Sequence, residues 1–328
     1  IWDAAKQRLF VARDRVGKKP LNYTVFDGGM AFCSELRPLS EFPRVPGEQD
    51  PEALELYLQL QYIPAPRTIF KSIRKLPPAS FGVFDRNGLQ IKEDWSVDYR
   101  PTIQVNENEA VEGLKAKLLE ALRIRLRADV PVGALLSGGV DSSLLVALLA
   151  EIRDEPFHTF NIGFKAERFD ESPFAQHVAD KCGTLHHNQT VETDIEAILP
   201  KVVRHYGEPY ADQSAVPSFA LCEQARAHVK VVVNGDGGDE LLGGYGRYQL
   251  TRRQQVLGRL GPGWNWSRRL LGLNSRFRGN PSLKNRVGRF VMRNVLHLCA
   301  SPEMRMSLMY RGFWNDRERG RLMKNGGR

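Results

Sequence analysis

The sequence predicts an α/β protein with a β-rich amino-terminal region followed by a doubly wound, mostly parallel sheet. Short apolar segments separated by turn signals fill residues 1–97. After residue 106, short apolar strands alternate with helical stretches of about ten or more residues, as in parallel sheets covered by helices. We expect one domain over residues 1–97, a linker over 98–106 and a second domain over 107–328.

The first region is predicted to be strands joined by hairpins. The first residues, "IWD", are typical of a β-strand that has already begun. Asp27-Gly28-Gly29 and Asn87-Gly88 are hairpin turn signals. The expected strands are "RLFVARD", "LNYTVF" and "MAFCSE". A proline-bearing stretch then leads into the hairpin "FGVFDRNGLQIKEDW".

The second region begins with a helix over 106–129, capped by Asn106 and followed by early acidic residues. Strands are expected at 130–136, 157–164 and 230–235. Helices are expected at 142–152, 170–182 with Gly183 closing it, 193–206, 214–228 and 239–249. Ligands of such sheets bind at the carboxyl ends of the strands.

Composition and charge favour a soluble globular protein. The chain has 42% hydrophobic and 26% charged residues, and no apolar run reaches the ~18–20 residues of a membrane-spanning helix. Its start is not typical of a signal peptide, so we expect a cytoplasmic protein. The chain has a net charge of +9, and its excess of positive charge lies in one segment, because residues 252–328 hold 18 basic and 3 acidic residues. We interpret this segment as solvated helix faces, with Trp264, Trp266 and Trp314 as core anchors, and consider nucleic-acid binding unlikely.

The stretch "LLSGGVDSS" is the first candidate ligand loop. Gly138 and Gly139 lie where a strand ends and a helix begins, which favours an anion such as phosphate. Asp141 would repel that anion unless a divalent cation lay between them, and Ser137, Ser142 and Ser143 supply hydroxyls. The loop therefore predicts ATP with Mg²⁺, although it lacks the lysine of a Walker loop. The alternative is a purely structural glycine turn in which Asp141 only caps the helix.

A second loop, "NGDGGDE", has the same character. Asn234, Gly235, Asp236 and Asp239 follow another apolar strand, and carboxylates so close together favour a cation or a positively charged ligand. An ordinary acidic surface turn is the alternative.

Histidine and cysteine give no clear metal pattern. Adjacent side chains on a strand point to opposite faces, so His186 and His187 are predicted to be structural, with no third ligand placed nearby. The four scattered cysteines show no CxxC spacing, so we expect neither a metal site nor a disulfide framework, and interpret most of them as core residues.

Together these motifs resemble a known family. "LLSGGVDSS" is similar to the pyrophosphate-loop signature of the ATP pyrophosphatases. "NGDGGDELLGGYGRY", "FNIGF…FDESPFAQHVADKCGTLHH" and "YGEPYADQSAVPSFALCEQARAHVKVV" narrow the resemblance to glutamine-hydrolysing asparagine synthetases of the asparagine synthase B type. "RLFVARDRVGKKPLNY" and "AFCSELRPL" resemble the end of that family's class II glutamine amidotransferase domain, which has an Ntn-type fold. The resemblance covers residues 1 to about 250 closely.

The resemblance implies ATP-dependent amidation of aspartate through β-aspartyl-AMP, with release of AMP and pyrophosphate. It places Ser137, Gly138, Gly139, Asp141 and Ser142 at the pyrophosphate with Mg²⁺, and Leu136 and Ile162 at the nucleoside. Asn234 and Gly235 would lie near the ribose or aspartate, and Asp239 would be a second Mg²⁺ partner. Asp236 stands where some members have glutamate, an acid linked to the chemistry. Asp212 and Ser214 are candidates for the aspartate pocket, or a loop with a helix cap.

For the glutaminase half, the resemblance makes Asp14 the acid that binds the α-amino group of glutamine, with pairing to Arg13 or Arg15 as the alternative. The family's nucleophile is an amino-terminal cysteine, which neither Ile1 nor the internal Cys33 replaces. We therefore expect a fragment lacking both ends that does not hydrolyse glutamine.

Two other functions stay open. One is an amidotransferase-like enzyme that adenylates another carboxylate in peptide or antibiotic biosynthesis, and the other is a tRNA-modifying ATP pyrophosphatase. The expected partners are aspartate and glutamine or ammonia, without a membrane, and a homodimer is possible.

Overall fold

The structure is a computed structural model that describes residues 1–100, 103–164, 170–190, 195–246, 248 and 323. The chain divides into two compact units. The first comprises Ile1–Tyr57 with Gln61–Asp236, and the second comprises Leu58–Leu60 with Gly237–Arg328. The first unit therefore holds all the sheets described below. The basic segment 252–328 and its three tryptophans lie outside the described residues, except Met323.

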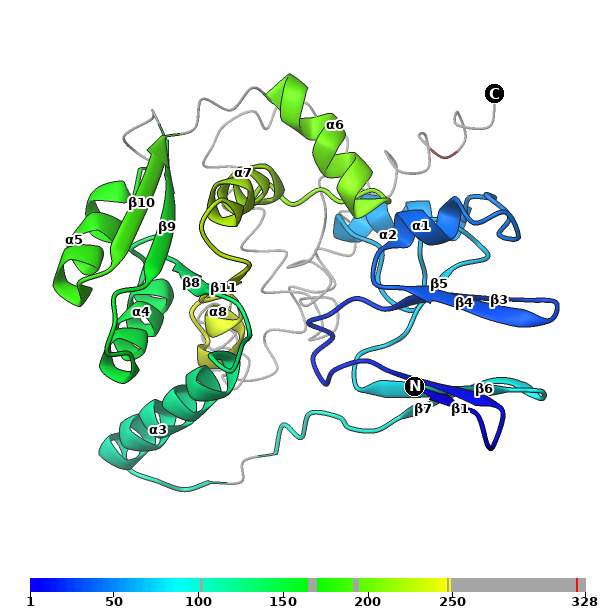
Figure 1. Cartoon of the computed structure of the whole chain (residues 1–328), viewed down its shortest axis with the longest axis horizontal. Helices are drawn as coiled ribbons and strands as arrows, with labels where there is room; N and C mark the ends of the chain where they lie inside the picture. The colour runs from blue at the N-terminus through cyan, green and yellow to red at the C-terminus, as the bar shows by residue number, and fades with distance from the viewer. Residues whose placement is uncertain (101–102, 165–169, 191–194, 247, 249–322, 324–328) are drawn as a thin grey trace, which may run out of the picture. The chain divides into compact units, whose positions relative to one another are not determined.

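Two antiparallel sheets form the amino-terminal region (Figure 1). The four-stranded sheet has the order β1-β2-β6-β7, and the three-stranded sheet has the order β4-β3-β5. Their strands are β1 (Trp2–Asp3), β2 (Arg8–Ala12), β3 (Asn22–Phe26), β4 (Gly29–Cys33), β5 (Arg74–Lys75), β6 (Ser80–Asp85) and β7 (Gly88–Glu93). The β-rich first region is thereby confirmed.

Both predicted hairpins are present, one of them shifted by a residue. In the first, Phe26 pairs with Gly29, so Asp27 and Gly28 form the loop. In the second, Asp85 pairs with Gly88, so the turn consists of residues 86–87 and Gly88 is already the first residue of β7. Its φ of +98° explains why a glycine stands at this strand start.

Two helices in this region were not predicted. α1 (Leu36–Ser40) and α2 (Pro51–Leu60) lie between β4 and β5. At the start of α2, the Asp50 carboxylate accepts a hydrogen bond from the amide of Glu52 at 3.0 Å, and Pro51 occupies the first turn. These two helices, the chain around them and the three-stranded sheet surround a buried cluster that includes Leu36, Ala53, Ile63 and Ile73.

The second sheet is entirely parallel, where the sequence predicted a mostly parallel one. Its order is β10-β9-β8-β11, and each neighbouring pair runs parallel. The strands are β8 (Val132–Leu135), β9 (His158–Gly163), β10 (Leu185–Thr190) and β11 (Val231–Val233). The central position of β8, with β11 beside it, brings the chain segments that follow these two strands to the same edge of the sheet.

Helices cover both faces of this sheet, which makes it doubly wound. On one face, buried residues of α3 (Glu107–Arg125), α4 (Val140–Ile152) and α5 (Ser172–Cys182) pack with Ala134 and Leu136. On the other face, α7 (Ala215–Arg226) and the residues that follow it pack against Phe160, and Leu135 adds to that cluster. Figure 1 shows α4 and α5 on the side of the strands opposite α7.

Helix ends follow the predicted capping residues in two cases and not in a third. Asn106 and Glu109 form a capping box at the start of α3. Gly183 ends α5 in the left-handed conformation, with φ +63°. The helix expected over 239–249 is interrupted, because α8 (Gly238–Leu242) ends at Gly243, whose φ is +72°, and among the described residues helical conformation returns only at Gly246 and Tyr248. α6 (Ile195–Tyr206) completes the set of described helices.

Within the first unit, hydrogen bonds join the amino-terminal region to the chain that follows α6. The Glu208 carboxylate accepts from the amide of Ile69 at 3.1 Å and pairs with the ammonium of Lys75. Lys75 also donates to the carbonyl oxygen of Ile63 at 2.6 Å. Both side chains of the ion pair are largely buried, so losing one partner would leave the other charge uncompensated.

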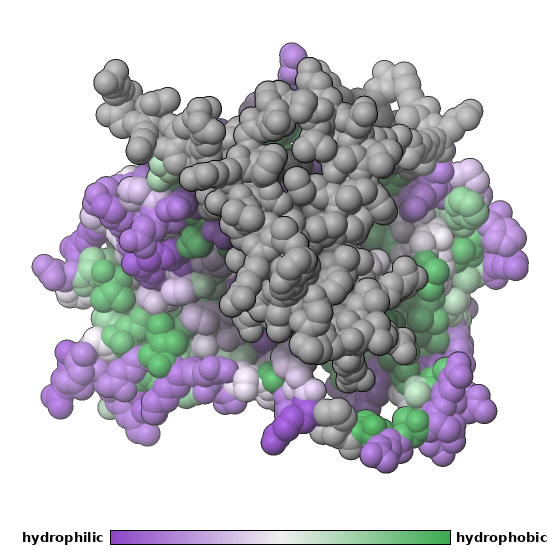
Figure 2. Space-filling view, turned by 180° about the vertical axis from the view of Figure 1, so that it is seen from behind, coloured by the Kyte–Doolittle hydropathy of each residue, from purple (hydrophilic) through white to green (hydrophobic). Residues whose placement is uncertain are grey.

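One face of the molecule can be followed in Figure 2. Where Figure 2 is not grey, green hydrophobic patches alternate with purple hydrophilic residues. Cys33 and Cys182 pack beside buried clusters, as expected, but Cys222 is exposed. None of the described helices combines the length and apolar character needed to cross a bilayer.

Candidate active site

The loop after β8 is shaped by hydrogen bonds between its own members. The amide of Leu136, which is 1% exposed, donates to the carbonyl oxygen of Phe160 at 2.8 Å and fixes the end of the strand. The buried Ser142 hydroxyl donates to the carbonyl oxygen of Gly139 at 3.2 Å and accepts from the amide of Ser137 at 3.3 Å. The two serine hydroxyls lie 3.0 Å apart, and the amide of Gly139 donates to Ser137 Oγ at 3.3 Å.

Proton counting in this network limits what the two serines can offer a ligand. A hydroxyl carries one proton. If Ser142 donates to Gly139, then Ser137 must supply the proton shared between the two hydroxyls. Ser142 is thus a loop-forming residue, whereas the exposed Ser137 hydroxyl can turn outward when a better acceptor arrives.

Gly138 serves helix packing as well as the loop. Its φ is +85°, and a Cβ at this position would lie 2.6 Å from the amide nitrogen of Ala175 and 2.7 Å from Phe174 Cβ. The close approach of α5 therefore requires a glycine here, a reason that the sequence prediction of ligand contact did not include.

The second loop meets the first at Gly235. A Cβ on Gly235 would lie 3.0 Å from the amide nitrogen of Ser142 and 3.1 Å from Asp141 Cβ. β11 lies beside β8 with Val233 opposite Ala134, so both loops leave the same end of the sheet. The structure thus brings Gly235, the residue between Asn234 and Asp236, next to the half-buried Asp141 at the first turn of α4.

Asp236 is held by its own loop. The side-chain amide of Asn234 donates to Asp236 Oδ2 at 2.6 Å, and both residues are exposed. Asp239 belongs to the second unit, where it lies in the first turn of α8 and its carbonyl oxygen accepts from the amide of Gly244 at 3.0 Å. The predicted Mg²⁺ roles of Asp141 and Asp239 stay predictions.

A third group consists of Tyr210, Asp212 and Ser214, just before α7. Asp212 Oδ1 accepts from the hydroxyl of Ser214 at 2.6 Å and from its amide at 2.8 Å, and the hydroxyl bond contributes most to lowering the pKa of Asp212. Burial, followed by the charge of Asp212, raises the pKa of Tyr210 to about 12, and the charge of Asp236 also contributes. Sequence reasoning missed Tyr210, because a tyrosine in a loop carries no signal of its own.

Ser214 is the residue before α7, but its side chain makes no capping hydrogen bond to the helix. The amide of Ser218 donates to the carbonyl oxygen of Ser214 at 2.9 Å. Among the described residues, the Tyr210 hydroxyl is the hydrogen-bond partner of Asp212 Oδ2, at 3.5 Å, and the pocket role of Asp212 and Ser214 stays a prediction.

Ile162 is buried near the carboxyl end of β9, beside a polar network that the sequence did not reveal. Asn161 Nδ2 donates to Ser172 Oγ at 2.9 Å and to Asn188 Oδ1 at 3.2 Å, and the Ser172 hydroxyl donates to Asp170 Oδ1 at 2.6 Å. This network ties β9 and β10 to the start of α5. Buried polar side chains of this kind stabilise one arrangement because each needs its partner.

In the amino-terminal region, Asp14 holds a turn. Its carboxylate accepts from the amides of Lys18 at 2.7 Å and Lys19 at 2.8 Å. Burial raises the pKa of Asp14, but these backbone bonds outweigh it and the pKa lies below its usual value. Arg13 donates to the carbonyl oxygens of Lys19, Leu76 and Gly17 instead. The expected role of Asp14 toward glutamine stays a prediction.

The histidine prediction is right about the faces of the strand and wrong about the third ligand. Thr159 Oγ1 lies 2.9 Å from His186 Nδ1, whereas His187 Nε2 lies 2.8 Å from His158 Nδ1. His228, after α7, joins His158 and His187, and the ligand atoms of the three lie within 4.8 Å of one another. Sequence spacing gives no hint of this cluster, because it depends on the register of β9 with β10.

Family models match most of the chain. The model described as "Asparagine synthase" matches residues 113–317, and the model described as "Glutamine amidotransferase domain" matches residues 1–95. The chain belongs to the asparagine synthase family. The loops after β8 and β11 both lie in the part of the chain that matches the asparagine synthase model. The part that matches the glutamine amidotransferase domain precedes it.

Curated relatives agree with this assignment. A putative glutamine-hydrolysing asparagine synthetase 2 of Methanocaldococcus jannaschii is 38% identical over 75% of this chain and 48% of its own length. Asparagine synthetase 1 of Bacillus subtilis is 33% identical over 76% of this chain and 39% of its own. "Amidase chyE" of Penicillium rubens is 30% identical, with the same coverage of 76% and 39%. The chain thus spans about half, or less, of the length of these relatives.

The loop after β8 has features that fit a nucleotide phosphate with Mg²⁺. The loop opens onto the amino terminus of a 13-residue helix, whose backbone dipoles favour an anion. Asp141 offers a carboxylate, the type of ligand that Mg²⁺ prefers. Ser143 Oγ is buried without a hydrogen-bond partner in the described part of the chain, so the loop retains a polar atom that its own fold does not satisfy.

Proposed function

We propose that the full-length protein converts aspartate to asparagine with ATP and with ammonia taken from glutamine. The observation that carries the proposal is the meeting of the two glycine-and-acid loops at Gly235, after neighbouring parallel strands. Family membership and the names of the relatives support the same reaction.

The proposed chemistry solves a leaving-group problem. A carboxylate is a poor acyl donor, so an oxygen of the aspartate side chain attacks the α-phosphorus of ATP and pyrophosphate leaves. Ammonia then attacks the acyl carbon of β-aspartyl-AMP, AMP leaves with the bonding electron pair, and one proton is released. Asparagine, AMP and pyrophosphate form in equal amounts.

On the ATP side, we assign the pyrophosphate and Mg²⁺ to Ser137, Gly138, Gly139, Asp141 and Ser142. The Ser142 hydroxyl keeps the loop in shape, while the exposed Ser137 hydroxyl reorients toward a phosphate oxygen. Leu136 and Ile162 supply apolar surface and backbone to the nucleoside, and Asp239 is proposed as a second Mg²⁺ ligand. Mg²⁺ would offset the charge of the leaving pyrophosphate.

On the aspartate side, we assign Asp212 to the α-ammonium group of the substrate. Its lowered pKa keeps it charged at neutral pH, and within the described part of the chain Oδ2 has one hydrogen-bond partner, the Tyr210 hydroxyl at 3.5 Å. Asn234 holds the Asp236 carboxylate nearby, where Asp236 would accept a proton from the attacking ammonia. Asp14 is proposed to bind the α-amino group of glutamine in the amidotransferase domain.

A second candidate is amidation of a different carboxylate. It is favoured by the fungal relatives named amidases, which are 30% and 29% identical to this chain. Under this proposal the ATP site is the same and only the carboxylate substrate differs.

The test supplies aspartate, Mg-ATP and ammonium ion to the full-length protein and measures AMP, pyrophosphate and asparagine together. We expect equal production of all three, and at least a ~100-fold loss in Asp141→Asn. Asp154→Asn, at an exposed carboxylate in the turn after α4, is the matched control and should keep full activity. AMP release that needs a carboxylate other than aspartate would support the second candidate. An undiminished rate in Asp141→Asn would contradict the site.

A further inference from the structure

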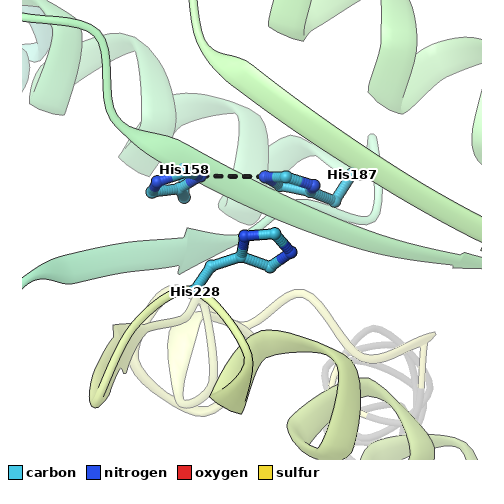
Figure 3. Close-up of side chains that lie close together, drawn as sticks. All are labelled: His158, His187 and His228. Carbon is cyan, nitrogen blue, oxygen red and sulfur yellow. Dashed lines mark hydrogen bonds between the residues drawn. The ribbon is translucent and has the colours of Figure 1, made fainter.

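Three imidazoles converge at a place that the proposed reaction does not use. His158 is the first residue of β9, His187 is the third of β10, and His228 follows α7 (Figure 3). Their ligand atoms all lie within 4.8 Å of one another. Among the described residues this is the one group of three or more His, Cys, Asp or Glu side chains so close together.

The surroundings favour neutral rings with available lone pairs. Burial is the main reason why the pKa values of His158 and His187 lie below the usual value, and the neighbouring His228 lowers both further. Metal ions bind the neutral imidazole. Phe160, which is fully buried, stacks on His187 with 5.1 Å between ring centroids and forms an apolar wall on one side. His228 is exposed, so the other side is open to water.

From this geometry we propose that His158, His187 and His228 form a binding site for a divalent transition-metal ion of the Zn²⁺ class. Three protein ligands with a water in the fourth position is a common arrangement for Zn²⁺. Imidazole nitrogen is also a preferred ligand of Co²⁺, Ni²⁺ and Cu²⁺.

Small movements suffice to bring the nitrogens into position. Two nitrogens on a tetrahedral Zn²⁺ lie about 3.3 Å apart, given Zn–N bonds of about 2.0–2.1 Å. His158 Nδ1 and His187 Nε2 are now 2.8 Å apart, so they would separate slightly, and the proton between them would move to the other nitrogen of its ring, which keeps both imidazoles neutral. The nitrogens that now lie up to 4.8 Å apart would approach, and the exposed position of His228 leaves it free to turn.

The site would link β9, β10 and the end of α7, and lies away from the ATP loops. His158 begins its strand, whereas the ATP loops follow the carboxyl ends of neighbouring parallel strands. Metal binding and ATP binding are therefore separable. An ion bound only by the folded chain raises the melting temperature.

The experiment titrates the full-length protein, freed of metal with a chelator and then supplied with Mg²⁺ to occupy carboxylate sites. Zn²⁺ binding is measured by calorimetry and Co²⁺ binding by its visible absorption. We expect one ion per chain, an absorption typical of nitrogen ligands, and a melting temperature that rises with Zn²⁺. His228→Gln should weaken binding by about tenfold or more, and His187→Gln combined with it should abolish binding.

His177→Gln is the matched control, because His177 is exposed on α5 and outside the cluster. It should bind Zn²⁺ like the wild type. His228→Gln tests the site without disturbing a buried residue, and unchanged Mg-ATP affinity would show that it folds. The proposal is overturned if the wild-type chain binds no Zn²⁺, or if His228→Gln binds it with unchanged affinity and stoichiometry.

Discussion

The two ligand loops follow neighbouring strands of one sheet but are built differently. The loop after β8 is held by bonds among Ser137, Gly139 and Ser142, with Ser142 buried, and leads into a helix of 13 residues. The loop after β11 shows a bond between two exposed side chains, from Asn234 to Asp236, and leads into a helix of five residues. The first forms a hydrogen-bonded frame, whereas the second presents charges and packs against that frame at Gly235. Mutations of the frame residues Gly138 and Ser142 should therefore lower stability, whereas mutation of the exposed Asp236 in the second loop should act on chemistry.

The largest loss of stability is expected for Gly138→Ala. A Cβ there would lie 2.6 Å from a backbone nitrogen of α5, and the residue has φ +85°, so backbone strain and overpacking combine. We expect a loss of about 2–4 kcal/mol in the free energy of unfolding, measured by urea denaturation.

Gly183→Ala is the control for the backbone part of this effect. Gly183 also has a positive φ, +63°, but nothing lies within 4 Å of its would-be Cβ. The expected loss is about 1 kcal/mol. Equal losses in the two variants would mean that the contact with α5 contributes nothing.

Next in size is the contrast between two adjacent serines. Ser142→Ala removes a buried hydroxyl that bonds to Ser137 and Gly139, and should cost about 1–2 kcal/mol and weaken Mg-ATP binding. Ser143→Ala removes a buried hydroxyl without a partner among the described residues, so the free energy of unfolding should stay within about 0.5 kcal/mol or rise. The opposite ranking in urea denaturation would contradict the frame role of Ser142.

The sequence predicted elements that depend on local signals. The strand-and-helix alternation, the capping box of Asn106 and the αL cap of Gly183 are all readable from short stretches. The start of α2 also has local helix signals, the N-cap Asp50 and Pro51 in the first turn. They were missed because the surrounding segments are strands. The end of α8 at Gly243 was missed because its glycines were taken as part of the helix.

Features that depend on long-range packing could not be predicted. The need for glycine at 138 comes from Ala175, and the meeting of Gly235 with Ser142 comes from strand order. The cluster of His158, His187 and His228 requires a parallel register and a helix end that no spacing encodes. The candidate residues of the two loops were found because glycines and acids after strands are a local pattern.

In the second loop, a change in charge should leave stability almost unaffected. Asp236 is exposed, so Asp236→Asn should shift the free energy of unfolding by less than about 0.5 kcal/mol. If Asp236 accepts a proton in the amidation step, the rate in the full-length protein should fall by about 100-fold or more, and Asp236→Glu should retain part of it. Full activity in Asp236→Asn, with Asp154→Asn as the surface control, would exclude this role.

The smallest expected effect is a shift in the pKa of Tyr210. It tests whether the charge of Asp236, in the second loop, acts on the residues around Tyr210. The pKa of Tyr210 is raised to about 12, mainly by burial, then by Asp212, with a smaller contribution from Asp236. Because the neutral phenol is favoured in the folded state, its contribution to stability is complete below the unfolded pKa of about 10 and is lost as pH rises toward 12. Tyrosine ionisation followed at 295 nm, with Tyr210→Phe to identify the late component, should give an earlier transition in Asp212→Asn and a slightly earlier one in Asp236→Asn. If only Asp212→Asn moves the transition, the charge of Asp236 does not reach the proposed aspartate pocket, and the second loop acts on the first loop alone.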